Sequence, residues 1–554
     1  MKQPCHRTLN LVEKLESLLC EPKPVFGGRK KAVVARAVEI VKEIEKVGNW
    51  SSVPYLVQFI LQPETEIAES AGRCVETLLR NIRPSLFPQL DERLRGGLYN
   101  LSERMRRWQA LKSFEENKYI AKNQRIVVTG IVSFHNDGFI RQTALKHLSE
   151  ITSGAELPFL LIRLSDWVQQ VRVIAINAVE QRVKPDYLQH FVHNIVLLDR
   201  IMQRQRLAGV AQRTALIERI FNEILQPTNR KILLDGLQHK DFEVRRTCLK
   251  LLRSSSIPDL SEILDLTIHD KDKTNRQIAI ELSNRLPFLE RLKLLNQLLW
   301  DRSAFVRLES LRILCNEPTD SSTSQLMAAL LDRSSAVREF ARWKLTDLES
   351  RIDFRKFYLE QIANNENTNE LANAALGLGE IGRSEDAQML IPRMIHSSVT
   401  VRKSVIQTLA RLDANHHSDL FIQQFQNEAP GISRVAANAL RSTMDAITAE
   451  ELWTIFTTTP FLHVKRNVLR MFNETSKWDR IIYLLLIASG DNPRFRTIAL
   501  SKLRSWHSEF ATTWAYTKPT VKQLELLIVG MQSFPEELPV QLREALEECI
   551  KINA

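Results

Sequence analysis

Apolar and polar residues alternate with helical spacing along most of the chain. In one clear example, Val306, Ser310, Ile313 and Leu314 lie three or four positions apart, so they share one face of a helix. A polar stretch with a proline follows and ends that helix. A second apolar run then covers 326–331. The pattern therefore predicts a unit of two short antiparallel helices joined by a tight turn.

A short motif recurs in the middle of the chain and sets its period. Four arginines at its centre stand 31 residues apart, at Arg245, Arg276, Arg307 and Arg338. An aspartate precedes each of them by four or six positions, at Asp241, Asp272, Asp301 and Asp332. A fixed period of about 20 to 50 residues is typical of stacked repeats, because each unit buries its apolar face only against its neighbours. The series continues in both directions at Arg141, Arg172, Arg402, Arg434, Arg466 and Arg496.

An aspartate followed by Val-Arg at the start of a second helix resembles the HEAT repeat. In that family the aspartate and the arginine bond between neighbouring units, so the resemblance implies that these ten arginines form a structural ladder. We predict an all-α, right-handed α-solenoid of about a dozen HEAT-like helical pairs with atypical capping ends. Two rungs fall outside the regular spacing, one at Arg213 and one near Asn369–Leu371.

The predicted array divides into four segments. These are an N-terminal helix with a basic linker (1–31), a first HEAT-like unit with a basic insertion (32–135), a regular array (136–510) and a C-terminal helical cap (511–554). A long polar helix is expected over Val196–Arg206. Residues 80–135 fit the repeat poorly and gather Arg93, Arg95, Arg104, Arg106 and Arg107 around Tyr99 and Trp108. This insertion is either a solvated basic helix face or a phosphate-binding or partner-docking segment.

Charge and cysteine content narrow the function classes. The chain has 554 residues, a net charge of +11 and a pI near 9.3, which favours acidic partners, although one arginine per repeat contributes to that charge for structural reasons. The six cysteines have no zinc spacing, and we expect Cys248 and Cys315 to be packed thiols. The start lacks an apolar signal core and no run reaches 18 apolar residues, so we expect a cytoplasmic protein without a membrane span.

Motifs that could carry chemistry favour structural roles here. Gly377, Gly379 and Gly382 satisfy the spacing GxGxxG, but they lie inside a helical repeat, where glycines end a helix and allow close packing. His416 and His417 occupy a turn, which favours turn polarity over a metal site. The sequence contains no nucleophile–base or paired-carboxylate constellation. We therefore predict no catalytic residue, no cofactor and no metal.

A series of basic residues follows the ladder arginines on the second helices. Positions one, four to five and seven to nine past each arginine turn away from the core. They hold Arg246, Lys250, Arg253, Arg312, Arg342, Lys403, Arg411, Arg441, Arg470 and Arg504. In HEAT-like solenoids the second helix lines the concave surface, so the resemblance implies a basic concave stripe, interrupted by Glu281 and Glu339. A merely solvated face is the alternative.

Three functions remain open on this reading. The leading hypothesis is a non-enzymatic interaction scaffold that holds another protein on the concave face. The positive net charge favours an acidic partner protein. The first alternative is a nucleic-acid binder that uses the same basic stripe. The third is an enzyme resembling the HEAT-like DNA glycosylases, which work with aromatic residues and an aspartate beside a basic cradle. Trp167, Trp300 and Trp343 would be its candidates, although they occupy different positions in separate repeats.

Overall fold

The fold is all-α, as predicted. The computed structural model describes residues 4–20, 31–60, 62, 64–80, 82–96, 125–203, 210–255, 260–317, 322–348, 351–510 and 518–553. No strand occurs among these residues. Contacts divide the chain into two units, Met1–Val306 and Arg307–Ala554, and each is described by itself. The four sequence segments stay a prediction.

Unit 1 is a series of short helical pairs. Its helices are α1 (His6–Cys20), α2 (Lys31–Val47), α3 (Val53–Ile60), α4 (Thr65–Arg80), α5 (Phe87–Gly96), α7 (Arg125–Val132), α8 (Gly138–Ser149), α9 (Leu157–Arg163), α10 (Gln169–Glu180), α11 (Pro185–His193), α12 (Ile195–Met202), α13 (Val210–Ile224), α14 (Arg230–Leu237), α15 (Phe242–Arg253), α16 (Ser261–Thr267), α17 (Lys273–Ser283) and α18 (Phe288–Leu298). The boundary between the units falls inside α19 (Ala304–Leu314).

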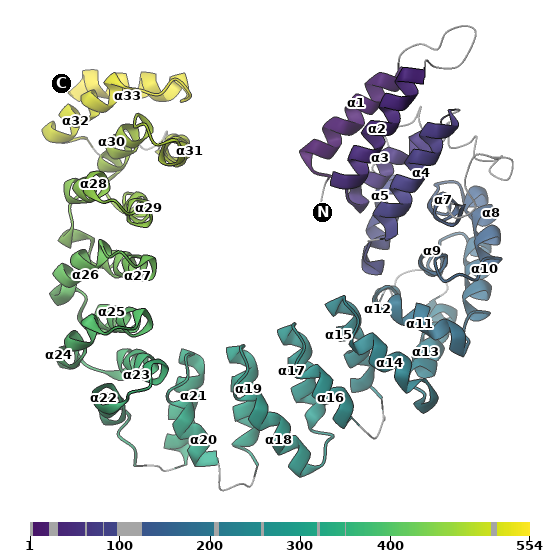
Figure 1. Cartoon of the computed structure of the whole chain (residues 1–554), viewed down its shortest axis with the longest axis horizontal. Coiled ribbons are helices and arrows are strands. Elements are labelled where there is room, and N and C mark those ends of the chain that lie inside the picture. The colour runs from purple at the N-terminus through teal and green to yellow at the C-terminus, as the bar shows by residue number, and fades with distance from the viewer. Residues whose placement is uncertain are drawn as a thin grey trace. The chain divides into compact units, whose positions relative to one another are not determined.

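Unit 2 repeats the same arrangement. Its helices after α19 are α20 (Ser322–Ala329), α21 (Ser335–Asp347), α22 (Phe354–Asn364), α23 (Thr368–Ile381), α24 (Ala387–Leu390), α25 (Val399–Asp413), α26 (Ser418–Phe425), α27 (Pro430–Leu440), α28 (Ala449–Thr458), α29 (Leu462–Met471), α30 (Lys477–Ala488), α31 (Pro493–Phe510), α32 (Val521–Gln532) and α33 (Val540–Asn553). Within this unit, the second helices form one layer and their partners form the other (Figure 1). The second helices are α21, α23, α25, α27, α29 and α31, and their partners are α20, α22, α24, α26, α28 and α30.

Short 3-10 helices link several of the α-helices. They are η1 (Trp50–Ser52), η2 (Pro84–Leu86), η5 (Pro227–Asn229), η6 (Ser384–Asp386), η7 (Ile391–Ile395), η8 (Asn415–His417) and η9 (Met444–Ala446).

Each second helix buries one apolar face between the layers. On α21, Val337, Ala341 and Leu345 are spaced by four and are fully buried, which places them on one face. Burial of a valine or leucine side chain stabilises by about 1.5–3 kcal/mol. The opposite face of the helix is free to carry Glu339 and Trp343, both of which are exposed. Packing between repeats therefore leaves one face of each second helix for other roles.

The segment around residue 200 differs from its prediction. The long polar helix expected over Val196–Arg206 is instead the short helix α12, and residues 204–209 lie outside the described part. Val196, Leu197, Leu198 and Ile201 of α12 are buried. The apolar face of this helix, rather than its charged residues, decides its position. Arg213 on α13 is also fully buried.

Only part of the basic insertion is described. Tyr99, Arg104, Arg106, Arg107 and Trp108 lie outside the described residues.

Arg93 and Arg95, the two described members of the predicted arginine cluster, both belong to α5. The Arg95 Nε lies 2.8 Å from an Asp91 carboxylate oxygen, and the Arg93 guanidinium lies over the Trp50 ring at 5.2 Å from its centroid. Arg93 and Arg95 therefore pack against the fold, whereas Arg80 and Arg83 are exposed.

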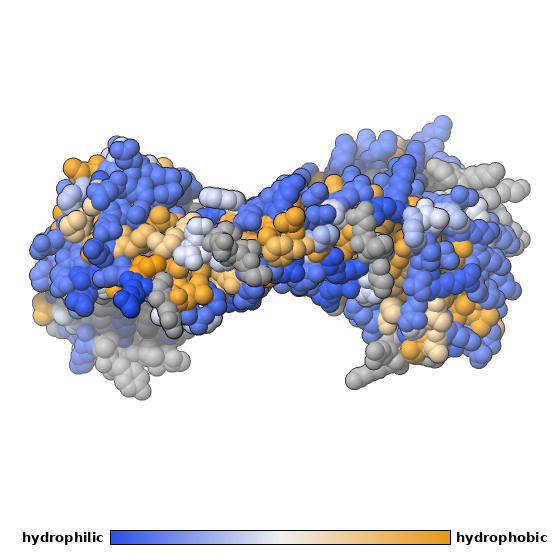
Figure 2. Space-filling model, turned by 90° about the horizontal axis from the view of Figure 1, so that it is seen from below, coloured by the Kyte–Doolittle hydropathy of each residue, from blue (hydrophilic) through white to orange (hydrophobic). Residues whose placement is uncertain are grey.

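Hydrophobic residues also reach the surface. On the face seen in Figure 2, separate hydrophobic areas lie among predominantly hydrophilic residues. Single exposed apolar side chains are normal on protein surfaces, whereas grouped ones mark interaction sites. Among the described residues, no helix combines the length and the apolar character needed to cross a membrane.

Candidate interaction surface

Four ladder arginines bind an aspartate of the following repeat. The Nε and Nη2 atoms of each donate to the two carboxylate oxygens of an aspartate 25 residues further on, at 2.6–2.9 Å. The pairs are Arg141–Asp166, Arg245–Asp270 and Arg276–Asp301 in unit 1, and Arg307–Asp332 in unit 2. The planar guanidinium matches a carboxylate in this two-bond geometry, so each pair fixes the orientation of two neighbouring repeats.

The aspartate in each pair lies six positions before the next arginine, not four. Asp270, rather than Asp272, accepts the hydrogen bonds of Arg245. Asp241 and Asp272, which the motif placed on the ladder, instead cap the N-termini of α15 and α17. The position six residues before the arginine lies in the turn that faces the preceding repeat, whereas the position four residues before it is the N-cap.

Hydrogen bonding keeps three of the ladder carboxylates ionised, those of Asp166, Asp270 and Asp301. Burial raises the pKa of Asp270, but the hydrogen bonds from Arg245 and Asn275 outweigh burial and hold that pKa below its ordinary value. The same balance applies to Asp166 and Asp301. Burial raises the pKa of each carboxyl, and the hydrogen bonds from its arginine contribute to holding that pKa below its ordinary value. Each carboxylate also accepts from the backbone N–H two residues later, as Asp301 does from Ser303 at 2.6 Å, which closes the turn ahead of the helix.

Two of the predicted rungs lack the regular bond to an aspartate side chain 25 residues on, where the sequence has Leu197 and Ala363. Arg172 donates from Nη1 to the backbone carbonyl of Asp166 in its own repeat, at 2.7 Å. Arg338 donates to the backbone carbonyl of Asp332 at 2.6 Å, and its other donors reach the carboxylate of Glu380 on α23, 42 residues on. At Arg338 the second helix of the next repeat thus supplies the carboxylate that a turn supplies elsewhere.

The last four predicted rungs do not form the regular pair. No ion pair joins Arg402, Arg434 or Arg466 to a residue in the described ranges, and Arg434 is exposed. Arg496 forms an ion pair with Glu537 at 2.9 Å, and both side chains are about half exposed. The regular arginine–aspartate pairs therefore lie between Arg141 and Asp332.

Half of the predicted basic stripe is paired with carboxylates. The ion pairs are Arg246–Asp272, Arg253–Glu281, Arg312–Glu309, Arg342–Glu380 and Arg441–Glu474. Two other members donate to neutral acceptors, Arg470 to the Asn467 side chain and Arg504 to the Glu537 backbone carbonyl. The remaining members, Lys250, Lys403 and Arg411, form no ion pair with any residue that the structure describes.

Arg342 does not point away from the core as expected. Its side chain is 13% exposed and forms an ion pair with Glu380 at 2.9 Å. Its Nη1 also donates to the hydroxyl of Tyr358 at 3.0 Å, and Tyr358 is fully buried. Because Arg342 lies one helical turn beyond Arg338, both arginines reach the same carboxylate.

An aromatic groove lies between α19 and α21 on the second-helix face of unit 2. Its volume is about 740 Å³, and its lining includes Leu308, Arg312, Phe340 and Trp343. Trp343 is 60% exposed, and the Phe340 and Trp343 ring centroids are 5.7 Å apart. The Arg312 guanidinium lies over the Phe340 ring at 5.5 Å from its centroid. We call this feature the aromatic groove; sequence reasoning missed it, because no motif joins residues of separate repeats.

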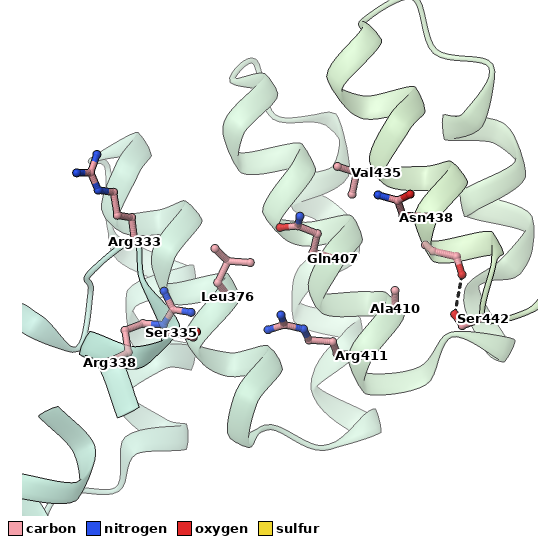
Figure 3. A pocket seen from close by; sticks show the side chains of 11 residues that line it. Arg333, Ser335, Arg338, Leu376, Gln407, Ala410, Arg411, Val435, Asn438 and Ser442 are labelled. Carbon is pink, nitrogen blue, oxygen red and sulfur yellow. Dashed lines mark hydrogen bonds between the residues drawn. The ribbon is translucent and has the colours of Figure 1, made fainter. Parts of the chain in front are cut away.

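A polar hollow opens on the other side of α21. Its volume is about 320 Å³. Helices α21, α23, α25 and α27 and the turn before α21 supply its lining, which includes Arg333, Arg338, Leu376, Gln407, Arg411 and Asn438. In Figure 3 the Arg411 side chain extends from α25 toward Arg338, beneath Leu376. No described carboxylate lines this polar hollow. Of the predicted stripe residues, only Arg411 reaches it.

The glycine motif serves the packing of α23. A Cβ on Gly377 would lie 2.4 Å from the ring of Tyr358, and one on Gly379 would lie 3.1 Å from the side chain of Thr408. Gly382 follows the last residue of α23 as its C-cap. These glycines end a helix and allow close approach of its neighbours, and no strand precedes them in this described stretch. Gly377, Gly379 and Gly382 therefore do not form a dinucleotide-binding loop.

The candidate tryptophans lie in different settings. In unit 1, the guanidinium groups of Arg95 and Arg141 lie over the Trp167 ring, at 4.4 and 4.5 Å from its centroid. Trp300, also in unit 1, is 87% exposed and lies ahead of α19. Trp343 belongs to the aromatic groove of unit 2. The Trp167 ring therefore packs against two structural arginines, and the three tryptophans do not lie in one local site.

The described titratable groups do not assemble a metal site. No group of three or more His, Cys, Asp or Glu side chains that could hold a metal ion occurs in the described part of the chain. His416 lies 3.6 Å from the Asp413 carboxylate at the surface. Burial raises the pKa of both Cys74 and Cys248 to about 12, and burial also raises that of Cys315 to about 11. These thiols are packed and protonated.

Comparisons with known proteins find similarity only among solved structures. No family model matches the sequence, and no curated protein matches it. A crystal structure of importin beta in an ammonium sulfate condition is 14% identical, with 98% of this chain and 72% of that chain covered and a TM-score of 0.36. A crystal structure of Kap121p is 11% identical, with 99% and 68% covered and a TM-score of 0.33. The C-terminal fragment of the cohesin loader SCC2 from Chaetomium thermophilum is 12% identical, with 98% and 45% covered and a TM-score of 0.29.

These superpositions are too loose to assign a function. The fold rests instead on the helical pairs, the shared layer of second helices and the arginine–aspartate ladder of this chain itself. The chain is a HEAT-like helical-repeat protein, an α-solenoid.

Proposed function

We propose that this protein is a non-enzymatic interaction scaffold that holds a partner protein on the second-helix face of unit 2. The observation that carries the proposal is the aromatic groove beside the polar hollow, on either side of α21. Interfaces concentrate their binding energy in a few aromatic and arginine anchors, and this face supplies both. A repeat array offers a long surface for such contacts.

The paired arginines favour a protein over a nucleic acid as the partner. Arg246, Arg253, Arg312, Arg342 and Arg441 already face carboxylates. Binding to the phosphate backbone draws its affinity from cations that replace counterions. Arginines that are neutralised by their own acids contribute little to that exchange.

Affinity purification from the host, with and without nuclease, tests the proposal. We expect a protein partner that survives nuclease treatment. Binding to that partner should fall only slightly between 50 and 200 mM salt. A nucleic-acid binder with around six phosphate contacts would instead lose roughly 10³-fold in affinity over that range, at a log–log slope near −5. Such a slope on a random duplex would refute the proposal.

Charge-reversal variants make the salt test specific to this surface. Arg342 is unsuitable because its replacement by an acidic residue would place a second carboxylate beside the nearly buried carboxylate of Glu380. Lys250→Glu, Lys403→Glu and Arg411→Glu change side chains without a described ion pair, so the triple variant should melt close to the parent. If Lys250→Glu still binds the protein partner at 200 mM salt and Arg411→Glu does not, the partner binds to unit 2.

A further inference from the structure

The polar hollow and the aromatic groove complement different parts of a ligand. Arg338 has its donors committed to Glu380 and to the Asp332 carbonyl, and Arg333 also has a partner, so the lining arginine whose donors are available to a ligand is Arg411. Arg411 is exposed and forms no ion pair with a described residue. A carboxylate accepts two parallel hydrogen bonds from one guanidinium. The polar hollow therefore fits an acidic group and not a basic one.

The cations that line the aromatic groove are paired with acids, and Glu339 is the other charged lining residue. Arg312 is paired with Glu309 at 3.1 Å, and Lys344 is paired with Asp347 at 2.8 Å. What remains uncovered is the aromatic surface of Phe340 and Trp343, which is grouped rather than scattered. Grouped, exposed apolar surface that is rimmed by polar side chains marks a binding site for an apolar side chain.

The fold sets the distance between these two sites. Trp343 lies on α21 and Arg411 on α25, with α23 between them. Two steps between neighbouring helix axes, at about 8–10 Å each, separate the axes of α21 and α25 by roughly 16–20 Å. An extended chain covers that distance in about five or six residues. A helical segment would need about 11–13 residues for the same distance, so the spacing of the two anchors in a ligand distinguishes an extended from a helical conformation.

We propose that unit 2 binds an extended, acidic segment of a partner protein across α21, α23 and α25. An aromatic or large aliphatic side chain enters the aromatic groove at Phe340 and Trp343. An Asp or Glu about five or six residues away pairs with Arg411 in the polar hollow. This inference rests on the proposed scaffold function and specifies which protein chemistry the scaffold recognises.

A random peptide display library selected against the full-length protein tests the inference without knowledge of the partner. We expect enriched peptides to share an apolar anchor and an acidic residue at this spacing. Fluorescence anisotropy then measures one enriched peptide against single variants. Trp343→Ala and Arg411→Glu should each weaken binding about tenfold or more. Trp300→Ala and Lys250→Glu should leave binding unchanged, because they change an exposed tryptophan and an exposed cation without a described ion pair, both in unit 1.

A second selection makes the charge assignment sharper. Library selection against Arg411→Glu should replace the acidic residue by Lys or Arg at the same distance from the anchor, a switch that a purely structural role of Arg411 would not produce. Thermal melting of each variant establishes that it remains folded. Trp343→Phe keeps an aromatic ring and should restore most of the affinity lost in Trp343→Ala.

Several outcomes would overturn the inference. They are the absence of enriched peptides, enrichment without an acidic residue, and binding that is insensitive to both Trp343→Ala and Arg411→Glu. Sedimentation of the parent as a dimer that Trp343→Ala converts to a monomer would assign the aromatic groove to a second copy instead. Recovery of a nuclease-resistant protein partner alongside any of these results would leave the scaffold function standing while this ligand class fails. Recovery of nucleic acid alone would remove both.

Discussion

Loss of Arg307 should show how much one rung of the ladder contributes to stability. Its side chain is 5% exposed and that of Asp332 is 14% exposed, and two hydrogen bonds of 2.6 and 2.7 Å join them. Breaking a buried ion pair by removing one partner costs about 3–5 kcal/mol. Asp332 keeps its bond from the Ser334 N–H and some exposure to water, which lowers that cost. We therefore expect Arg307→Ala to destabilise unit 2 by about 2–4 kcal/mol.

The chain supplies a matched control for this variant. Arg434 occupies the same predicted rung position in a later repeat, but it is exposed and forms no ion pair with a described residue. Arg434→Ala should change stability by no more than about 0.5 kcal/mol.

Urea titration combined with hydrogen exchange in α19 and α21 would measure both effects, because long repeat arrays unfold in parts. Equal losses for Arg307→Ala and Arg434→Ala would refute the reasoning. So would a double-mutant cycle between Arg307 and Asp332 with coupling below about 0.5 kcal/mol.

Three further predictions follow from the same contacts. The lowered pKa of Asp301 means that its stabilisation is present above the unfolded value of about 3.9 and is lost as pH falls through the folded value, so melting of Asp301→Asn should depend less on pH below about 4 than melting of the parent. Gly377→Ala should destabilise by about 1–3 kcal/mol in a urea titration, because its Cβ would meet a tyrosine ring, whereas Gly490→Ala, with no neighbour closer than 3.4 Å, should not. Cys5 is exposed and a hydrogen bond with Thr8 lowers its pKa, so mass spectrometry after iodoacetamide treatment should find it modified well before the buried Cys248.

The repeat period and the helical fold could be read from the sequence because they depend on local spacing. An arginine every 31 residues and an apolar face on every second helix recur regardless of what the neighbouring repeats contain. The positions of Arg245, Arg276 and Arg307 in the regular ladder follow from that spacing. Their carboxylate partners were harder to place, since both an N-cap and a ladder position favour aspartate.

The candidate site depends on contacts between repeats, which spacing does not specify. Glu380 takes the role of a ladder aspartate from 42 residues away, and no motif marks it. Asn427 stands 25 residues after Arg402, where the regular ladder has an aspartate, so an arginine with the right spacing lacks the right partner. Exposure of Arg342 was misjudged for the same reason, because the carboxylate that draws it inward belongs to α23.

The departure from the repeat at α22 and α23 also explains where the polar hollow lies. Ala372, Ala375 and Gly379 keep α23 slim and let α25 approach closely, with Thr408 donating to the Ala375 carbonyl at 2.8 Å. A slim helix between two helices that carry long polar side chains leaves a depression, and Arg411 extends into it. A regular array presents the same surface at every repeat and offers a ligand no preferred position. Binding at one place along the array requires such an irregularity. In unit 2 it lies where Arg338 bonds Glu380 of α23 instead of an aspartate in the next turn.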